Sequence, residues 1–283
     1  MNFPRQRVSE LRDTRSYVPI QISMCFKNEE IACGTAFFYL HEDKSYLVTN
    51  WHNVTGREPS TLKCKSNQAA LPNHLFIKIP SSTHDSSGLK FIEWTTYVIP
   101  LYEDEGDSPK QPVWYEHPRY RYQVDLVAIP ININGVKGSE IKHANDPNFK
   151  LDNIRLCPGL DVFVLGFPRG LSGGANFPVW KRGSIASEPD FDIDGLPKLF
   201  IDTATREGMS GAPVYARQVG YWLPEGATNQ DEAMIGEGRK FLGIYSGRVG
   251  DDSFKAQLGI VWKPSAIEET IKAAMAGNSS FYM

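Results

Sequence analysis

The sequence predicts an all-β fold of the barrel or sandwich class, followed by one helix. Short runs rich in Val, Ile, Phe, Tyr and Thr recur along its 283 residues. Polar and glycine-containing clusters such as 41–44 and 172–176 separate these runs, a pattern typical of sandwiches and barrels. All-β barrels of roughly 200 to 250 residues commonly form one unit, so we expect a single domain over 1–283.

The helix is expected at the C-terminal end, over about 264–276. Ser265 and Glu268 have the S-x-x-E spacing of a capping box. Ile267, Ile271 and Met275 lie four residues apart and would form one apolar stripe. The stripe predicts a helix that packs against the β-structure.

The segment 208–211, Gly-Met-Ser-Gly, contains a candidate nucleophile. Glycine at 208 permits backbone conformations closed to other residues and leaves N–H groups unobstructed, as an oxyanion site requires. Gly and Ser are also favoured in ordinary turns. A serine hydroxyl is a poor nucleophile at neutral pH, so Ser210 would need a histidine base and a carboxylate that orients it.

Candidates for both partners lie upstream of the serine. Of the six histidines, only His52 closes an apolar, β-rich run, at 45–54. Asp125 opens an aliphatic strand pattern that ends at Pro130, and a carboxylate buried there would require a partner. Asp161 precedes a similar run and is the competing acid on pattern alone.

The order His52, Asp125, Ser210 resembles that of the chymotrypsin-like, or trypsin-like, serine peptidases. Four segments match the family in its order: 34–39 with 47–52, 117–128, 202–211, and 242–247 with 258–261. The third segment is most similar to the nucleophile loop of bacterial HtrA-type members. Asp161 would fall in the second half of such a fold, so the order favours Asp125. It also excludes the α/β-hydrolases, in which the nucleophile comes first.

The resemblance implies two antiparallel six-stranded β-barrels. They would cover about 14–131 and 153–262, joined by a linker at about 132–152. It further implies a serine endopeptidase in which Ser210 attacks a peptide carbonyl, His52 takes its proton and Asp125 orients the imidazole. The N–H groups of Gly208 and Ser210 would form the oxyanion hole. Two alternatives stay open: an esterase with the same triad, and an inactive binding module that retains the fold.

The resemblance also implies a primary specificity pocket, which holds the side chain on the acyl side of the cleaved bond. No carboxylate stands at its base, so a preference for Lys or Arg is not supported. Its base and walls would be formed by Thr203, Ala204, Thr205, Ser246, Gly247, Arg248 and Gly259.

Met209 bears on regulation. Secreted family members carry an aspartate at this position, which pairs with a new N-terminus after zymogen cleavage. Methionine cannot form that ion pair. We therefore expect the oxyanion loop to be shaped by packing or by a protein partner that activates or inhibits the enzyme.

The composition limits the compartments in which the protein could act and the partners that it could bind. Lys and Arg number 30 against 33 Asp and Glu, a net charge of -3, so we expect no nucleic-acid partner. No apolar run approaches the ~18 residues that span a membrane, and no apolar signal core follows the N-terminus. We expect a cytoplasmic protein that acts on a peptide or protein substrate, without a membrane.

The cysteines agree with a reducing compartment. Extracellular members of the family usually carry a disulfide beside the catalytic histidine, but Asn53 follows His52 here. No Cys-x-x-Cys or His-x-x-x-His spacing occurs, so no metal and no cofactor is expected. Reduced thiols are expected at all four cysteines, Cys25, Cys33, Cys64 and Cys157.

Overall fold

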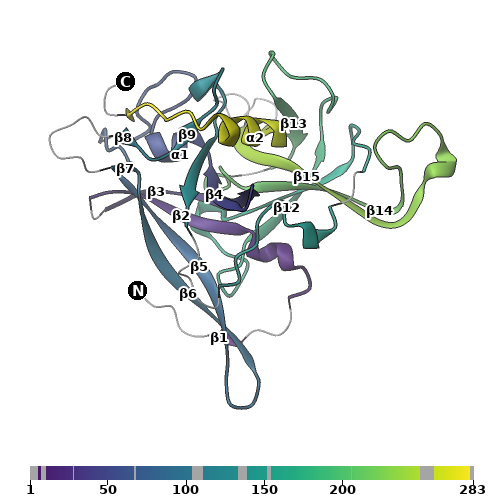
Figure 1. Cartoon of the computed structure of the whole chain (residues 1–283), viewed down its shortest axis with the longest axis horizontal. Helices are drawn as coiled ribbons and strands as arrows, with labels where there is room; N and C mark the ends of the chain where they lie inside the picture. Colours follow the sequence, from purple (N-terminus) through teal and green to yellow (C-terminus); the bar gives the residue numbers. More distant parts are fainter. Residues whose placement is uncertain are drawn as a thin grey trace.

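Strands form two large sheets, one in each half of the chain (Figure 1). The computed structural model describes residues 6–7, 11–27, 29–66, 68–103, 111–132, 139–151, 154–204, 206–248 and 258–280. Residues 133–138 and 152 of the expected linker lie outside these ranges.

The N-terminal half folds into an eight-stranded antiparallel sheet in the order β1-β6-β5-β2-β3-β4-β10-β9. Two short strands, β7 (Tyr102–Glu103) and β8 (Gln111–Pro112), form a separate pair. The strands of the large sheet are β1 (Gln6–Arg7), β2 (Pro19–Phe26), β3 (Glu29–His41), β4 (Lys44–Thr49), β5 (His74–His84), β6 (Lys90–Pro100), β9 (Tyr115–Glu116) and β10 (Val127–Ile131).

The C-terminal half forms a closed six-stranded barrel in the order β11-β12-β13-β16-β15-β14. The all-β fold with a six-stranded barrel and a terminal helix is thus confirmed. The strands of the barrel are β11 (Asp161–Gly166), β12 (Val179–Ile185), β13 (Lys198–Asp202), β14 (Pro213–Trp222), β15 (Met234–Arg248) and β16 (Leu258–Trp262).

The first half has eight strands rather than the six expected, because the short strands β1 and β9 are added at the two edges of the sheet. Its β5–β6 hairpin is also long. The two strands stay paired from His74 and Pro100 to His84 and Lys90, and the hairpin projects downward from the rest of the molecule in Figure 1. Its outer edge pairs with β1 through Gln6. The extension adds an edge strand to the sheet without contributing to the site.

Helix α1 (Trp51–Thr55) follows β4 directly, and α2 (Pro264–Ala273) follows β16. The predicted capping box does not form, because α2 begins at Pro264 with Lys263 as its N-cap and no side-chain cap bond. Proline suits the first helical position, since it lacks the N–H that would need a partner there. Short 3-10 helices are η1 (Thr14–Tyr17), η2 (Arg121–Gln123), η3 (Pro147–Phe149), η4 (Pro168–Gly170) and η5 (Gln230–Glu232).

The apolar stripe of α2 is shorter than predicted. Ile267 and Ile271 are buried in the core, whereas Met275 lies beyond the end of the helix and is 40% exposed. The buried pair still attaches α2 to the β-structure, as the pattern predicted.

A shared hydrophobic core joins the two halves. It contains Phe37 and Val48 from the first sheet together with Leu165 and Phe241 from the barrel. The rings of Phe37 and Phe241 pack edge to face with their centroids 5.8 Å apart, a favoured arrangement for aromatic pairs. The shared core therefore fixes the loops of one half in position relative to the loops of the other.

The residues after α2 return to the N-terminal half, where the yellow segment runs in Figure 1. Gly277 N–H donates to the Trp114 carbonyl at 2.9 Å. The Ser280 carbonyl accepts from Arg57 Nε at 3.0 Å and from Arg57 Nη2 at 2.7 Å. The last described residues thus bind the segment that immediately follows α1.

Candidate active site

His52 lies on α1, a single helical turn fixed at both ends. Gly56 ends the turn in the left-handed region, with φ +68°, and its N–H donates to the His52 carbonyl at 3.0 Å. At the start of the turn, the buried Trp51 indole donates to Glu116 Oε1 at 3.1 Å. Position and direction of the imidazole therefore follow from a rigid local frame.

The carboxylate of Glu116 fixes this helical turn. The side chain is fully buried, and an isolated charge there would be costly without partners. Its Oε1 accepts from Asn278 N–H at 3.0 Å as well as from Trp51, and Arg121 Nε lies 3.0 Å from its Oε2. The carboxylate thus ties α1 to the C-terminal segment.

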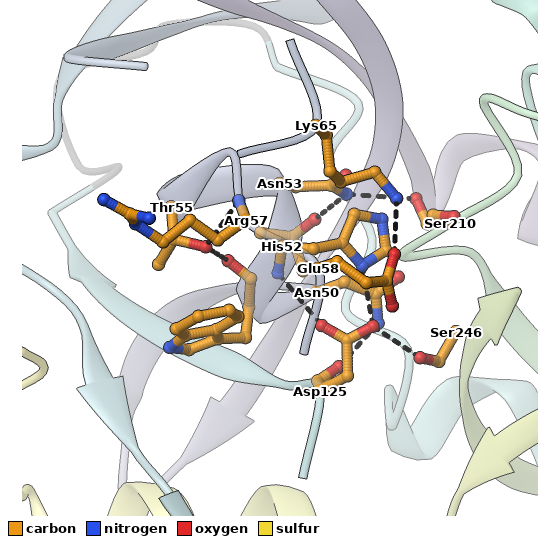
Figure 2. Close-up of polar contacts among 12 residues, drawn as sticks. Asn50, His52, Asn53, Thr55, Arg57, Glu58, Lys65, Asp125, Ser210 and Ser246 are labelled. Carbon is orange, nitrogen blue, oxygen red and sulfur yellow. Dashed lines mark hydrogen bonds and ion pairs between the residues drawn. The ribbon is translucent and has the colours of Figure 1, made fainter. Parts of the chain in front are cut away.

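Asp125 contacts His52 through both of its carboxylate oxygens (Figure 2). Oδ2 lies 2.7 Å from His52 Nδ1, and Oδ1 accepts the His52 backbone N–H at 2.9 Å. The two side chains are 5% and 10% exposed, respectively. This geometry requires the proton on Nδ1 and leaves Nε2 for the cavity.

The pKa of Asp125 is lowered from its ordinary value of 3.8. Burial alone would raise the pKa of this carboxyl, but the charge of protonated His52 and the hydrogen bonds from His52 and the Ser246 hydroxyl outweigh it. Ser246 Oγ donates to Asp125 Oδ2 at 2.6 Å. Asp125 is therefore ionised at neutral pH.

Asp161, the competing acid, does not approach the histidine. It pairs with Arg182 on the surface, with Arg182 Nη2 2.7 Å from Asp161 Oδ2 and the two side chains 68% and 39% exposed. The preference for Asp125 as the partner of His52 agrees with this arrangement.

Ser210 lies on a loop that the N-terminal half holds in place. Its carbonyl accepts from Thr35 N–H at 2.9 Å and from Asn53 Nδ2 at 3.3 Å. The Thr35 hydroxyl donates to the Gly208 carbonyl at 2.7 Å. Contacts across the two halves thus bring the serine loop to the histidine.

Two glycines in the loop have no substitute. Gly208 has φ +87°, and a Cβ there would lie 2.4 Å from the Phe167 carbonyl oxygen. Gly211 has φ +89°, and a Cβ there would lie 1.9 Å from the Thr35 carbonyl oxygen. Only glycine adopts this backbone conformation readily, and a side chain at either position would clash. These two constraints explain why glycine stands at 208 and at 211.

Two backbone N–H donors of the loop have no partner among the described residues. The Glu207 carbonyl accepts from Arg169 N–H at 2.6 Å, and in a trans peptide the N–H of Gly208 points the opposite way. Neither the Gly208 nor the Ser210 N–H donates to another residue within the described part of the chain. Two free N–H groups beside a serine can bind an oxyanion.

The Ser210 hydroxyl makes no hydrogen bond to His52, both being described residues. Each is nevertheless accessible from the same two cavities, so a substrate would meet both groups together. The Ser246 cavity, of about 720 Å³, includes His52, Asp125, Ser210, Tyr245 and Ser246 in its lining. The Cys33 cavity, of about 530 Å³, includes Cys33, His52, Asn53, Gly208 and Ser210.

Comparisons with known proteins add weak similarities of overall fold. No protein-family model and no curated protein sequence matches this chain. Among solved structures, a serine-to-alanine mutant of Rv3671c from M. tuberculosis in an inactive form is 15% identical, with a TM-score of 0.44 over 91% of this chain and 86% of that one.

Two further structures are similar at the same level. The Rv3671c protease in its inactive form is 14% identical, with a TM-score of 0.43 over 91% of this chain and 89% of that one. A serine endoprotease from Yersinia pestis is 12% identical, with a TM-score of 0.40 over 94% and 67%.

The predicted pocket residues are only partly brought together. Ser246, Gly247 and Arg248 line the Ser246 cavity. Thr203 is buried, and its hydroxyl donates to the Arg182 carbonyl at 3.4 Å. Neither of the two cavities is lined by Thr203, Ala204 or Gly259. The remaining predicted pocket residue, Thr205, lies outside the described residues.

Sequence reasoning did not assign Thr35 and Asn53, which position the serine loop. Asn53 is buried, and its side chain donates to Thr49 Oγ1 at 3.0 Å as well as to the Ser210 carbonyl. A polar residue directly after His52 in an apolar run was the available signal, because a buried amide needs partners. Nothing local marks Thr35, whose contact lies in the other half.

Other kinds of site are not indicated in the described residues. No cluster of three or more His, Cys, Asp or Glu side chains there could hold a metal ion. Cys25, Cys33, Cys64 and Cys157 are all free. No helix in the described part of the chain has the length and apolar character needed to cross a membrane.

Proposed function

We propose that the chain is a serine endopeptidase with the triad His52, Asp125 and Ser210. One observation carries the proposal: Asp125 holds both Nδ1 and the backbone N–H of His52, at 2.7 and 2.9 Å, while Ser210 shares two cavities with that histidine. An acid that fixes the tautomer of a base beside a serine is the arrangement that nucleophilic catalysis requires.

In the first half-reaction, Ser210 Oγ attacks a peptide carbonyl carbon and its proton passes to His52 Nε2. The carbonyl electron pair moves onto oxygen, which accepts from the N–H groups of Gly208 and Ser210. When this intermediate collapses, the C–N bond breaks and His52 protonates the leaving amine. The product is an acyl-enzyme on Ser210.

Water completes the cycle. His52 takes a proton from the water as its oxygen attacks the acyl carbon, and the same two N–H groups stabilise the second oxyanion. Collapse breaks the ester bond, and the proton returns to Ser210 Oγ. Asp125 stays ionised throughout and stabilises the transient imidazolium.

The finer features of the resemblance belong to the same proposal. We place the chain among trypsin-like serine peptidases with an HtrA-type nucleophile loop, acting in the cytoplasm on a peptide or protein substrate. Met209 is fully buried in the barrel core, which supports shaping of the loop by packing. A protein partner would then activate or inhibit the enzyme by changing the access of substrate to the two cavities. Full activity of the pure monomer would argue against an activator.

A binding module without catalysis is the second candidate, favoured by the absence of a hydrogen bond from Ser210 to His52. A fluorophosphonate probe distinguishes the peptidase from the binding module, because it labels only an activated serine. We expect wild-type protein to be labelled and Ser210→Ala not to be. Equal labelling of both proteins would refute the assignment of Ser210.

Mass spectrometry of a mixed peptide library then distinguishes a peptidase from an esterase. Wild type should produce internal cleavages that Ser210→Ala does not. Labelling without any peptide cleavage, together with hydrolysis of simple esters, would favour the esterase. Neither labelling nor cleavage would favour the binding module.

A further inference from the structure

Two glycines on the paired strands β15 and β16 have different surroundings. A Cβ at Gly247 would meet no atom within 4 Å. A Cβ at Gly259 would lie 2.5 Å from Tyr245 Cε2 and 3.3 Å from Ile201 Cγ1. The space beside Gly247 is therefore open, whereas the space beside Gly259 is filled by the Tyr245 ring.

Tyr245 is held firmly in that position. It is 1% exposed and belongs to the barrel core together with Ile201, Met209 and Val261. Its N–H donates to the Ala212 carbonyl and its carbonyl accepts from Gly211 N–H, both at 2.8 Å. The residue is thus tied by its backbone to the serine loop and by its ring to the core.

The lining of the Ser246 cavity agrees with a filled pocket. Tyr245 lines this cavity together with Ser210 and Ser246. Gly259 lies against the ring; it and Thr203 are both buried and line neither cavity at the site. Tyr245 therefore forms the floor where a deeper side-chain pocket would otherwise open.

We infer that Tyr245 restricts the substrate to a small side chain, that of Gly, Ala or Ser, on the acyl side of the cleaved bond. The inference rests on the proposed peptidase function and names its substrate class. A large side chain would have to displace a packed core tyrosine, and overpacking of a filled interior is unfavourable. A small side chain needs no displacement.

The test uses peptides that need no catalysis to bind. Acetylated tetrapeptides with a free C-terminal carboxylate, ending in Ala, Leu or Phe, are titrated into Ser210→Ala protein by calorimetry. The carboxylate would accept from the N–H groups of Gly208 and residue 210, which aims the last side chain at Tyr245. We expect the Ala peptide to bind about 10-fold or more tightly than the Phe peptide, since steric selection in a pocket reaches that size.

A second variant removes the tyrosine ring from the floor of the Ser246 cavity. In Tyr245→Val/Ser210→Ala protein, the Leu and Phe peptides should gain about 10-fold or more in affinity, with the Ala peptide little changed. Tyr221→Val is the matched control, because Tyr221 is 70% exposed on β14 and should alter no preference. If Tyr245→Val does not fold, the preference measured with Tyr245 present decides alone.

The results separate this inference from the proposed function. Equal or tighter binding of the Phe peptide with Tyr245 present would overturn the inference, as would the absence of binding by every peptide. Wild-type protein that cleaves after Phe as fast as after Ala would also overturn it and leave the peptidase function intact. Selective binding of the Ala peptide without any cleavage by wild type would support the inference and refute the peptidase.

Discussion

Ser246 Oγ and His52 Nδ1 share one acceptor, Asp125 Oδ2, at 2.6 and 2.7 Å. The hydroxyl comes from the barrel, whereas Asp125 and His52 come from the N-terminal half. One carboxylate oxygen therefore connects the base to a wall of the Ser246 cavity.

Ser246→Ala should lower kcat about 10-fold, because a hydrogen bond to a charged group is worth roughly 1.5–3 kcal/mol. Ser246 is a positioning residue, so the loss should fall on kcat, with KM little changed. Ser246→Thr should restore much of the rate, and Ser172→Ala, at an exposed serine, should change nothing. An unaltered kcat in Ser246→Ala would contradict the positioning role.

Asp125→Asn should reduce kcat by about 10,000-fold while leaving the fold intact, because the amide favours the wrong imidazole tautomer. Steady-state cleavage of the best library peptide measures the loss, and thermal unfolding checks the fold. Asp161→Asn serves as the control, since that carboxylate pairs with Arg182 on the surface. A loss confined to Asp161→Asn would reverse the assignment.

Gly208→Ala should lower activity about 100-fold or more, the cost of losing one oxyanion donor. Gly159→Ala is the matched control, because Gly159 has the same φ, +87°, but a Cβ there would meet nothing within 4 Å. The control should lose only the cost of the left-handed backbone, about 1–2 kcal/mol of unfolding free energy, and keep full activity. Equal behaviour of the two variants in both assays would show that the Phe167 contact does not shape the loop.

His117 should make the protein less stable in mild acid. Burial lowers the pKa of this imidazole from its ordinary 6.5, although Glu269, 3.1 Å away, opposes the shift. The folded state therefore holds a neutral His117, and unfolding takes up a proton. The stabilisation is fully present above pH 6.5 and is lost as the pH falls from there toward the lowered pKa.

Urea unfolding between pH 5 and 8 measures this dependence. His117→Asn should show a smaller fall in unfolding free energy below pH 6.5 than wild type does. His41→Asn, at a half-exposed histidine of β3, is the control and should retain the wild-type slope. A wild-type slope in His117→Asn as well would rule out His117 as the source.

The candidate site was predictable where the signal is local. His52 and Asp125 each stand at one end of an apolar strand run, and the glycines around Ser210 mark a special backbone. The structure brings His52 and Asp125 together because β4 and β10 are neighbours, with Thr49 opposite Val127. Chain order was needed to choose between Asp125 and Asp161, since both runs look alike.

The remaining features depend on contacts distant in sequence. The spacing of Ser265 and Glu268 suggested a cap, but Pro264 moved the helix start ahead of both. The expected pocket depended on small residues such as Gly259, and no local pattern reveals that the ring of Tyr245 lies against it. Periodicity reports which face of a strand is buried, not which neighbour fills the space.

The hydrogen bonds from Arg57 to Ser280 and from Asn278 to Glu116 make the surroundings of His52 depend on residues that follow the barrel in the chain. The N-terminal half therefore cannot fix its own histidine, and we expect the base to be held in place only once the segment after α2 has docked. Limited proteolysis of a chain truncated after Ala276 should cut near α1 sooner than in the full chain; equal cutting rates would contradict this dependence.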